Sequence, residues 1–416
     1  MSDAPIEFID ALAAVLADLE PLPGEPVPLA AALGRSLAAD AVAGAPVQAF
    51  DNSAMDGCAL RAADTAGASA GSPVALRLVG ESRAGHPAAV AVAAGEAVAI
   101  STGAMIPAGA DAVVRVEDSR REGDTVLVEV EARPGLDLRR AGEDFAAGDT
   151  VLPRGAAIGP AALGALASLG LDPVPCFRRP RVAVLTSGDE LRPAGASLPP
   201  GTIPDSNGHS VPALAELAGA ELVSRAWAPD DAATIEAALA PALEAEVTIV
   251  CGGVSVGEHD HVKGALERLG VEQVFWRIAL KPGGPTWFGR RGASLVFGLP
   301  GNPVSAMVTF LLLARPALLA LGGGEPGARR TRAVLTTDYE KPAGRLHAVR
   351  CRLELSAAGW RAHPFPRQGS HVLSSMLGAD CLALIPAAAT RIAAGESVEI
   401  ELFDGAGALA GASISS

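Results

Sequence analysis

Cysteine is scarce in this chain of 416 residues, and the five that occur lie far apart. No two of them form a C-x-x-C pair, and their number is odd. The sequence therefore offers neither the spacing of a zinc site nor the even count of a disulfide framework. We expect the protein to work in a reducing cytoplasm.

Basic residues are also few, because 33 Lys and Arg stand against 47 Asp and Glu, for a net charge of −14. Such an acidic chain is not expected to bind nucleic acid or an anionic membrane over a general surface. An anionic substrate would have to be held locally, by a few Lys or Arg side chains and by backbone N–H groups.

Long uninterrupted apolar runs are missing as well. The most apolar segment, residues 306–321, is interrupted by Arg315-Pro316 and is too short to span a bilayer, so we expect a buried helix there. The acidic N-terminus (MSDAPIEF) lacks the basic-then-apolar order of a signal peptide. These absences predict a cytoplasmic protein with no membrane partner.

The length and the changes of pattern along the chain predict several domains, since 416 residues are too many for one compact core. Near the N-terminus the apolar residues have helical spacing. They are followed by short β-branched runs separated by Gly, Pro and Asp, and after these runs the helical spacing occurs again. We expect an elongated N-terminal helical region (1–45 and 146–178), an inserted β-rich domain (46–145), an α/β domain (179–327) and a C-terminal β-rich domain (328–416).

The third of these regions alternates strand-like and helix-like segments from Arg181 onward. This alternation predicts a three-layer α/β/α domain with a mostly parallel sheet that is covered on both faces. Ligands of such sheets bind at the carboxyl ends of the strands. Most of the polar, glycine-rich turns of this region fall at those ends.

Two of these turns, GGVSVGEHDHVK and GLPGNPVSA, each connect an apolar run to a helix-like segment. Backbone N–H groups that point outward from such turns suit an anion. Asp260 and Lys263 lie close to the first turn, which suggests a phosphorylated ligand with a metal ion. The first turn has no lysine within its glycines, so it is not a P-loop.

Eight motifs occur in one order along the chain: FDNSAMDG, STGAMIPAGADAVVRVED, RRAGEDFAAGD, TSGDEL, IPDSNG, GGVSVGEHDHVK, KPGGP and GLPGNPVSA. In this set and order the chain resembles the molybdopterin molybdenumtransferases, the molybdenum insertases of molybdenum-cofactor synthesis, which are related to the E domain of gephyrin. The resemblance covers essentially the whole chain.

The resemblance implies a reaction in which adenylylated molybdopterin and molybdate give molybdenum cofactor and AMP, with magnesium as the divalent cation. It also implies an elongated homodimer whose active site lies between the α/β domain of one subunit and the inserted domain of the other. Two alternatives are the preceding step, adenylylation of molybdopterin, and a gephyrin-like scaffold without insertase activity. The three additional regions of this chain favour insertion over adenylylation.

The family's functional positions map onto residues of this sequence. Catalytic positions match Asp56, Asp144, Glu190, Asp260 and Lys281. Molybdate positions match Lys281, Arg350 and Ser370, and candidate magnesium ligands are Glu190, Asp230 and Asp260. The expected substrate contacts are Thr102, Ser187, Gly188, Asp205, Ser206, Asn207, Gly252, Gly253, Ser255, Gly257, Pro300, Gly301, Asn302 and Ser305.

Structural roles remain as alternatives for most of these residues. Asp230 and Asp260 would suit helix caps, and Asp56, Thr102 and Asp144 would suit turns. Arg350 could be an exposed strand residue, and GLPGNPVSA could be a helix entry without a ligand. His259 and His261 flank Asp260, but a histidine metal site is not favoured.

The sequence departs from the family at two positions. Most members have tyrosine where this chain has Cys58, and many have a second lysine where it has Gly284. Arg277 matches a basic family position, but part of the expected oxyanion cluster is missing at Gly284. Arg367 and His371 are candidates to replace the lost charge.

Overall fold

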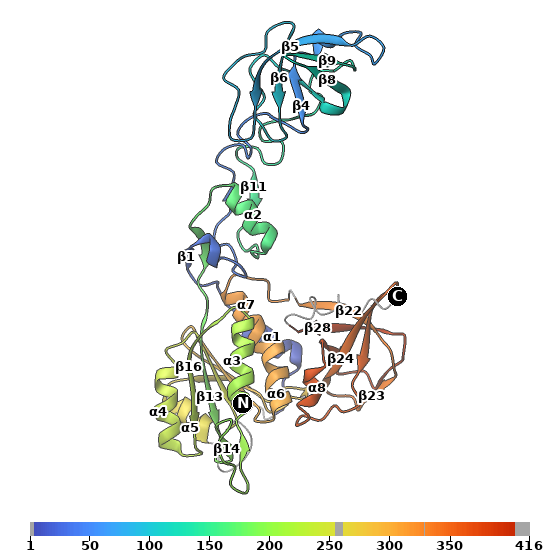
Figure 1. The fold of residues 1–416 in the computed structure, drawn as a ribbon. Helices are drawn as coiled ribbons and strands as arrows, with labels where there is room; N and C mark the ends of the chain where they lie inside the picture. Colours follow the sequence, from blue (N-terminus) through green and yellow to red (C-terminus); the bar gives the residue numbers. More distant parts are fainter. Residues whose placement is uncertain (1–3, 254–260, 328, 404–416) are drawn as a thin grey trace. The chain divides into compact units, whose positions relative to one another are not determined.

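The computed structural model describes residues 4–253, 261–327 and 329–403, and Figure 1 traces the chain from blue to red along the sequence. By its internal contacts the chain forms two compact units. The smaller unit comprises residues 40–154 and 160–174, and the larger unit comprises residues 1–39, 155–159 and 175–416. The four domain limits expected from the sequence stay predictions.

The smaller unit is built on a six-stranded sheet with the order β7-β4-β6-β5-β9-β8. Its strands are β7 (Ala112–Arg115), β4 (Gly57–Leu60), β6 (Glu96–Ile100), β5 (Val74–Ser82), β9 (Thr125–Val128) and β8 (Ser119–Glu122). Alternate side chains of these strands meet in a core that includes Leu60, Leu76, Val114 and Val126. The unit also contains short pairings of β3 (Asn52–Ser53) with β10 (Leu138–Arg139), and of β2 (Ala41–Val42) with β11 (Thr150–Leu152). Helix α2 (Pro160–Ser168) completes the unit.

The larger unit contains a second six-stranded sheet, in the order β16-β13-β17-β21-β20-β18. Strands β16 (Glu221–Ala228), β13 (Arg181–Ser187), β17 (Val247–Cys251) and β21 (Ser294–Leu299) are parallel. Strand β20 (Trp287–Arg291) runs antiparallel to both β21 and β18 (Glu272–Trp276). The sequence analysis did not predict β20, and it placed a longer strand where β18 and the short β19 (Leu280–Lys281) occur.

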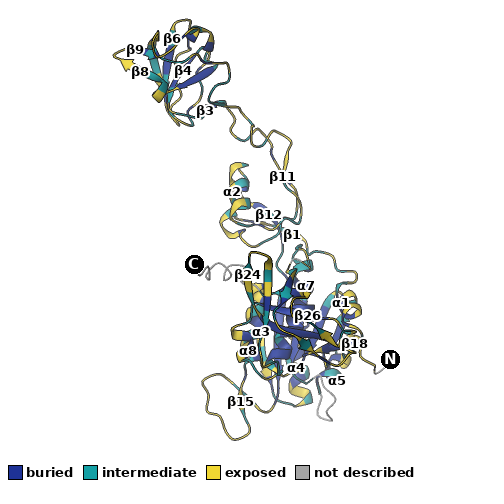
Figure 2. Ribbon diagram, turned by 90° about the vertical axis from the view of Figure 1, so that its right-hand side faces the viewer, coloured by how far each residue is buried: buried dark blue, intermediate teal, exposed yellow. Residues whose placement is uncertain are grey.

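Side chains of this sheet belong to two hydrophobic clusters, one on each face, because neighbouring residues of a strand point to opposite faces. One cluster contains Val184 and packs with α1 (Phe8–Leu16), α3 (Asn207–Leu217), α6 (Pro303–Thr309) and α7 (Arg315–Leu321). The other contains Leu185 and packs with α4 (Ala232–Ala242) and α5 (His261–Arg268). In Figure 2 buried segments gather in the interior of this part of the chain, whereas the helices also carry exposed residues.

Helices α6 and α7 are joined by a π-helical segment (Phe310–Ala314) into one continuous helix, Pro303–Leu321. Among the described residues it is the one helix long and apolar enough to cross a membrane. Its 18-residue apolar window is 83% buried inside the protein, as a core helix would be. The segment expected to be a buried helix is therefore buried, but the helix is longer than predicted.

The remaining strands of the larger unit form a sheet in the order β19-β24-β25-β22-β28-β26. They are β24 (Leu346–Ser356), β25 (Gly359–Pro364), β22 (Arg330–Leu335), β28 (Ser397–Leu402) and β26 (Cys381–Ile385), with β19 at one end. An additional pairing of β24 with β26 closes five of these strands into a barrel. Its core includes Leu335, Val349, Ile385 and Ile400.

Several short elements complete the larger unit. Strands β1 (Gly24–Val27) and β12 (Val174–Phe177) pair with each other, and so do β14 (Leu191–Arg192) and β15 (Ile203–Pro204). Strand β23 (Tyr339–Glu340) pairs with β27 (Arg391–Ile392), and α8 (Ser374–Leu377) follows the loop that leaves β25.

Candidate functional site

A cavity of about 650 Å³ lies where β13, β17 and β21 end, at the carboxyl edge of the parallel strands. It collects residues from four of the sequence motifs and one residue from the loop after β25. Its lining consists of Ser187, Gly188, Glu190, Leu191, Ile203, Pro204, Asp205, Ser206, Asn207, Asp230, Cys251, Gly252, Gly253, Gly301, Asn302, Pro303 and His371. This position is the one expected for ligands of such a sheet.

The turn after β13 is held by Asp230, which lies in the loop after β16. The Ser187 hydroxyl donates to Asp230 Oδ1 (2.8 Å), and the Asp189 N–H donates to Asp230 Oδ2 (3.4 Å). The indole N–H of Trp227 donates to the Gly188 carbonyl (3.1 Å). The helix-cap alternative for Asp230 is wrong, because Asp231 caps α4 by accepting from the Thr234 N–H. Neither Trp227 nor Asp189 was expected at the site: Trp227 lies outside the eight motifs, and Asp189 lies inside TSGDEL but was not among the expected site residues.

The IPDSNG motif places two buried polar side chains beside this turn. Asp205 Oδ2 accepts from the Thr186 hydroxyl and Asp205 Oδ1 accepts from the Gly208 N–H, both at 2.8 Å. A Cβ at Gly208 would lie 2.2 Å from Asp205 Oδ2, so the motif requires glycine there. Asn207 Nδ2 donates to the Gly301 carbonyl (2.7 Å), whereas its buried Oδ1 has no partner among the described residues.

Both glycines at the end of β17 are fixed by close packing. Gly252 and Gly253 have φ of +92° and +63°, and a Cβ at Gly252 would lie 2.5 Å from the Ser187 carbonyl oxygen. Only glycine adopts such a conformation without strain at such a close approach. The expected site residues Ser255, Gly257 and Asp260 lie outside the described residues, as does His259.

The start of α6 forms a further wall of the cavity. Gly301, Asn302 and Pro303 line it, and Asn302 caps no N–H of α6 with its side chain. Of the other expected residues in this motif, Pro300 and Ser305 do not line the cavity, and Ser305 is only 3% exposed. The described starts of α3 and α6 both face the cavity, and the first-turn N–H groups of a helix favour an anion.

The loop after β25 is docked onto this helix start. Asn302 Nδ2 donates to Ser370 Oγ, and the Val304 N–H donates to the Ser370 carbonyl, both at 3.2 Å. Ser370 itself is not part of the lining, but the next residue, His371, is.

Arg350 lies at the other side of this loop and is fully buried, with 1% of its surface exposed. Its Nε donates to Ser375 Oγ (3.2 Å) and its Nη2 donates to the Gly369 carbonyl (3.3 Å). No carboxylate in the described part of the chain pairs with it, and burial lowers the pKa of this guanidinium. The alternative that Arg350 is an exposed strand residue is therefore wrong.

Lys281 is exposed in β19 and does not line the cavity. It pairs in register with His347 of β24. Burial, and then the charges of Lys281, Lys341 and Arg345, lower the pKa of His347 to about 4. At Gly284 a Cβ would meet its nearest neighbour, the Leu280 carbonyl oxygen, at 3.4 Å, so a side chain has room there.

In the smaller unit, three motifs converge around Asp51 and Asp56. Asp56 Oδ1 accepts from the N–H (2.6 Å) and the hydroxyl (3.1 Å) of Thr102. Asp51 accepts from the Ala141 N–H and from Arg140, and these two hydrogen bonds lower the pKa of the Asp51 carboxyl. Asp51 thus fixes the loop that carries Asp144, which is exposed.

The sequence analysis missed Asp51, although it lies inside the FDNSAMDG motif. Cys58, one residue beyond this motif, is buried in the core of the sheet, and burial raises the pKa of its thiol to about 11. The departure from the family at this position therefore changes the core of the unit rather than its surface.

The described residues contain no group of three or more His, Cys, Asp and Glu that could enclose a metal ion. The carboxylates that line the cavity would therefore need further ligands, such as water or substrate oxygens, to complete a metal site. Both oxygens of Asp230 are engaged by protein donors, whereas Glu190 has no partner for its carboxylate among the described residues. Magnesium commonly takes one or two carboxylates together with water and phosphate oxygens, and this donor set fits that pattern.

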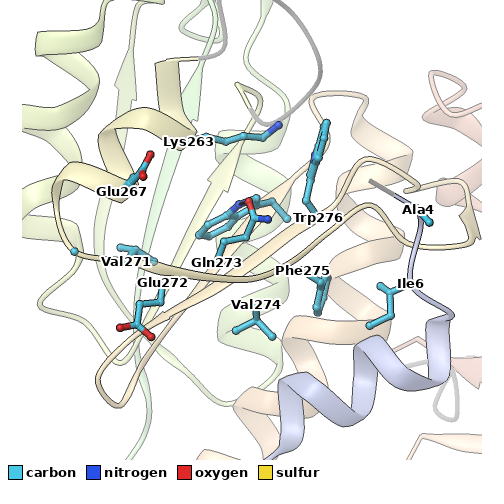
Figure 3. A pocket seen from close by; sticks show the side chains of 12 residues that line it. Ala4, Ile6, Lys263, Glu267, Val271, Glu272, Gln273, Val274, Phe275 and Trp276 are labelled. Carbon is cyan, nitrogen blue, oxygen red and sulfur yellow. Dashed lines mark hydrogen bonds between the residues drawn. The ribbon is translucent and has the colours of Figure 1, made fainter. Parts of the chain in front are cut away.

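A larger cavity of about 890 Å³ lies along β18, the edge strand of the sheet, and Figure 3 shows its lining. Lys263 Nζ lies 3.6 Å from the centroid of the Trp276 ring in this cavity. Its lining includes none of the residues expected to bind substrate, molybdate or magnesium. The smaller cavity is therefore the candidate site.

Three family models match successive parts of the chain. They are described as "MoeA N-terminal region (domain I and II)" for residues 6–170, "Probable molybdopterin binding domain" for residues 183–320, and "MoeA C-terminal region (domain IV)" for residues 332–403. A solved structure of the molybdopterin biosynthesis moeA protein from Pyrococcus horikoshii superposes with a TM-score of 0.83 at 30% identity, and covers 96% of this chain and 100% of that chain.

Two curated relatives match the chain over most of their length. The "Molybdopterin molybdenumtransferase" of Haemophilus influenzae is 38% identical, covering 90% of this chain and 92% of the relative. The "Molybdopterin molybdenumtransferase 2" of Mycobacterium tuberculosis is 39% identical, covering 90% and 94%. The chain belongs to the molybdopterin molybdenumtransferase family.

Proposed function

We propose that this protein inserts molybdenum into molybdopterin during molybdenum-cofactor synthesis, using adenylylated molybdopterin and molybdate and releasing AMP. One observation carries the proposal. A single cavity collects the TSGDEL, IPDSNG, GGVSVG and GLPGNP motifs together with a residue of the loop after β25. Membership of the family supports the transferase activity, and the cavity supplies the groups that a phosphorylated substrate needs.

The phosphate groups of the substrate would lie against the starts of α3 and α6. The positive ends of the two helix dipoles favour negative charge there. The N–H groups of Gly208 and Val304 are themselves engaged by Asp205 and Ser370. Ser187 and Asn207 add neutral polar groups, and the unpartnered Asn207 Oδ1 is an acceptor for a substrate N–H or hydroxyl. Asp205 and Trp227 hold these groups in place without being free to bind.

Molybdate would be held by Arg350, Lys281 and Ser370. Arg350 is buried without a carboxylate partner in the described structure, and such a charge is costly unless an anion compensates it. Its guanidinium can donate two parallel hydrogen bonds to a tetrahedral oxyanion. Its contact with the Gly369 carbonyl also holds the loop that carries Ser370.

Magnesium would be held by Glu190 and Asp230, with Asp260 as a further candidate outside the described residues. When bound, the ion would supply positive charge to the pyrophosphate oxygens. Glu190 is the more direct ligand, because Asp230 already accepts from Ser187 and Asp189. The chain's own part is to keep these carboxylates in place beside the helix starts.

The rest of the family's organisation belongs to the same proposal. Asp56, Thr102 and Asp144 of the inserted domain would complete the site of a partner subunit in a homodimer. The fold around the cavity would be a three-layer α/β/α domain, which the two hydrophobic clusters of the sheet support. The protein would work in the cytoplasm.

The test is AMP release from adenylylated molybdopterin and magnesium, with and without molybdate. We expect molybdate-dependent release by the wild-type protein and a much weaker response in Lys281→Ala, since Lys281 is exposed and its loss leaves the core intact. The matched control is Arg352→Ala, which removes an exposed cation from neighbouring β24. Substrate binding without AMP release in the wild type would contradict the proposal and point to a scaffold.

A further inference from the structure

The candidate cavity is strongly acidic for a site that is meant to take a phosphorylated substrate. Glu190, Asp205 and Asp230 line it, and neither Lys nor Arg occurs among its lining residues in the described structure. Like charges close to a phosphate are unfavourable in a partly enclosed site. His371 is the one basic side chain in this lining.

His371 is brought to the cavity by contacts that fix its backbone. Its neighbour Ser370 is bound twice to the start of α6, through Asn302 and the Val304 N–H. One residue earlier, the Gly369 carbonyl accepts from the buried Arg350. The next backbone link, from the Leu373 N–H to the His371 carbonyl (3.0 Å), closes the loop.

The imidazole of His371 remains available for a ligand. Asp205 and Asp230 each have both carboxylate oxygens engaged by a hydroxyl and a backbone N–H. His371 is exposed, and its ring has no hydrogen-bond or ion-pair partner in the described part of the protein. The ring lies against Gly369, where a Cβ would come within 3.0 Å of His371 Cε1, so the space beside it is kept small.

We propose that His371 is a substrate-binding residue that recognises a phosphate group of the nucleotide part of the substrate. An imidazole donates an N–H to a phosphate oxygen in its neutral form, and its protonated form adds a positive charge. In this assignment the carboxylates of the cavity bind a cation or hold the turns in place, and His371 interacts with the negative charge of the phosphate. This assignment rests on the proposed function for the nature of the ligand.

The experiment compares binding of AMP and of adenosine by titration calorimetry to the full-length protein. The variants are His371→Gln, which keeps a neutral donor, and His371→Lys, which provides a permanent cation. The matched control is His86→Gln, which removes an exposed histidine of the smaller unit. We expect His371→Gln to weaken AMP binding about 5- to 10-fold, as for loss of a charge-assisted hydrogen bond. Adenosine binding should be unchanged, and His371→Lys should retain AMP binding.

The contrast between the two ligands separates recognition from a merely structural role. A variant that only distorts the loop would weaken AMP and adenosine alike, and His371→Lys would not restore AMP binding; either result overturns the proposal. Equal binding of AMP and adenosine by the wild type also overturns it. Molybdate-dependent AMP release by the wild type is measured separately, so failure of this assignment leaves the proposed function standing.

Discussion

At the scale of single residues, Asp205 links its own loop to the end of β13 and to the start of α3. Its carboxylate accepts from the Thr186 hydroxyl at the end of β13 and from the Gly208 N–H at the start of α3, and the residue is 8% exposed. Asp205→Ala would leave the Gly208 N–H unpaired in a nearly buried place, and the Thr186 hydroxyl would keep only the distant Ala226 carbonyl (3.5 Å). We expect the free energy of unfolding to fall by about 1–3 kcal/mol, measured by chemical denaturation.

Asp205→Asn is the control for this prediction, since its amide keeps one acceptor for the Gly208 N–H and can donate to the Thr186 oxygen. We expect a smaller loss of stability than in Asp205→Ala. Equal losses in the two variants would show that the carboxylate charge, rather than the hydrogen bonding, stabilises this turn.

Gly284 is the second residue whose replacement the structure makes informative. A Cβ there would make ordinary contacts with the carbonyl oxygens of Leu280 (3.4 Å) and Ile278 (3.7 Å), and the φ of Gly284 lies outside the left-handed region. Gly284→Lys restores the lysine common in the family, so we expect an unchanged fold. The apparent KM for molybdate should fall severalfold because a cation is added near the oxyanion, as steady-state kinetics would show.

Gly283→Lys tests whether that effect is specific to position 284. A Cβ at Gly283 would lie 2.3 Å from Thr309 Cγ2, and its φ is +113°. We expect this variant to lose stability and activity together. A Gly284→Lys protein with a higher KM for molybdate would contradict the assignment of this region to the oxyanion.

His347 gives the protein a defined dependence of stability on pH. Its pKa in the folded state is lowered to about 4, whereas its ordinary value is 6.5. Between these values the unfolded chain binds a proton that the folded protein does not, so acid favours unfolding. The stability linked to His347 is complete above pH 6.5 and is lost as the pH falls toward 4.

We expect wild type to lose about 2 kcal/mol more than His347→Gln between pH 6.5 and 4.5, measured by urea denaturation. Glutamine removes the titration and can still hydrogen-bond the Tyr339 hydroxyl, which contacts His347 Nδ1 in the wild type. Carboxylates with a lowered pKa, such as Asp51 and Glu246, are common to both proteins and cancel in the comparison. Parallel stability curves would be the contradicting result.

At the scale of elements, a buried ion pair connects α7 to the C-terminal barrel. Glu401 of β28 accepts from Arg315 of α7 and from Arg330 of β22, and Arg315 and Glu401 are 1% and 2% exposed. Glu401→Gln would remove the charge of the buried carboxylate that pairs with Arg315 and, at 2.8 Å, with Arg330. We expect a loss of about 3–5 kcal/mol, measured as a shift of the denaturation midpoint.

The control is Glu399→Gln, two residues earlier on the same strand. Glu399 lies 3.4 Å from Arg330 Nη1, but its side chain is 46% exposed. Exposed ion pairs contribute about 0–1 kcal/mol, so this variant should be close to wild type. If both variants behaved alike, burial would not be the source of the stabilisation.

The elements also show how far local sequence patterns reach. Strand, glycine turn and helix are neighbours in sequence, so the TSGDEL and GLPGNP turns were correctly expected at the ends of the buried strands β13 and β21. IPDSNG also lines the cavity, but it begins with the short exposed strand β15. Strand β20 and the closure of the barrel through β24 and β26 depend on pairings between distant segments. Such pairings leave no periodic signal in either strand, which is why they were missed.

The same limit applies to the site residues. The sequence indicated that Arg350 mattered, but its complete burial follows from packing against Ser375 and Gly369, which lie 25 and 19 residues away. Likewise, nothing in the sequence placed Trp227 against the Gly188 carbonyl. Motifs predicted which segments meet, whereas the supporting contacts between them required the fold.

At the scale of the whole molecule, the proposal divides the catalytic residues between two subunits. Asp56 belongs to the smaller unit, where Thr102 holds its carboxylate, and Glu190 lines the cavity of the larger unit. Asp56→Ala and Glu190→Gln should each abolish molybdate-dependent AMP release. If two subunits combine these residues, a mixed dimer of the two variants contains one intact site and one doubly defective site.

We therefore expect mixing the two variants under conditions of subunit exchange to restore activity to roughly a quarter of the wild-type level, since about half of the dimers are mixed. The measurement is AMP release before and after exchange, with light scattering to establish the dimer. Mixing either variant with itself is the control and should restore nothing. A dimer that exchanges subunits but regains no activity would place Asp56 and Glu190 in the same subunit's site, and a monomer would rule out the shared arrangement altogether.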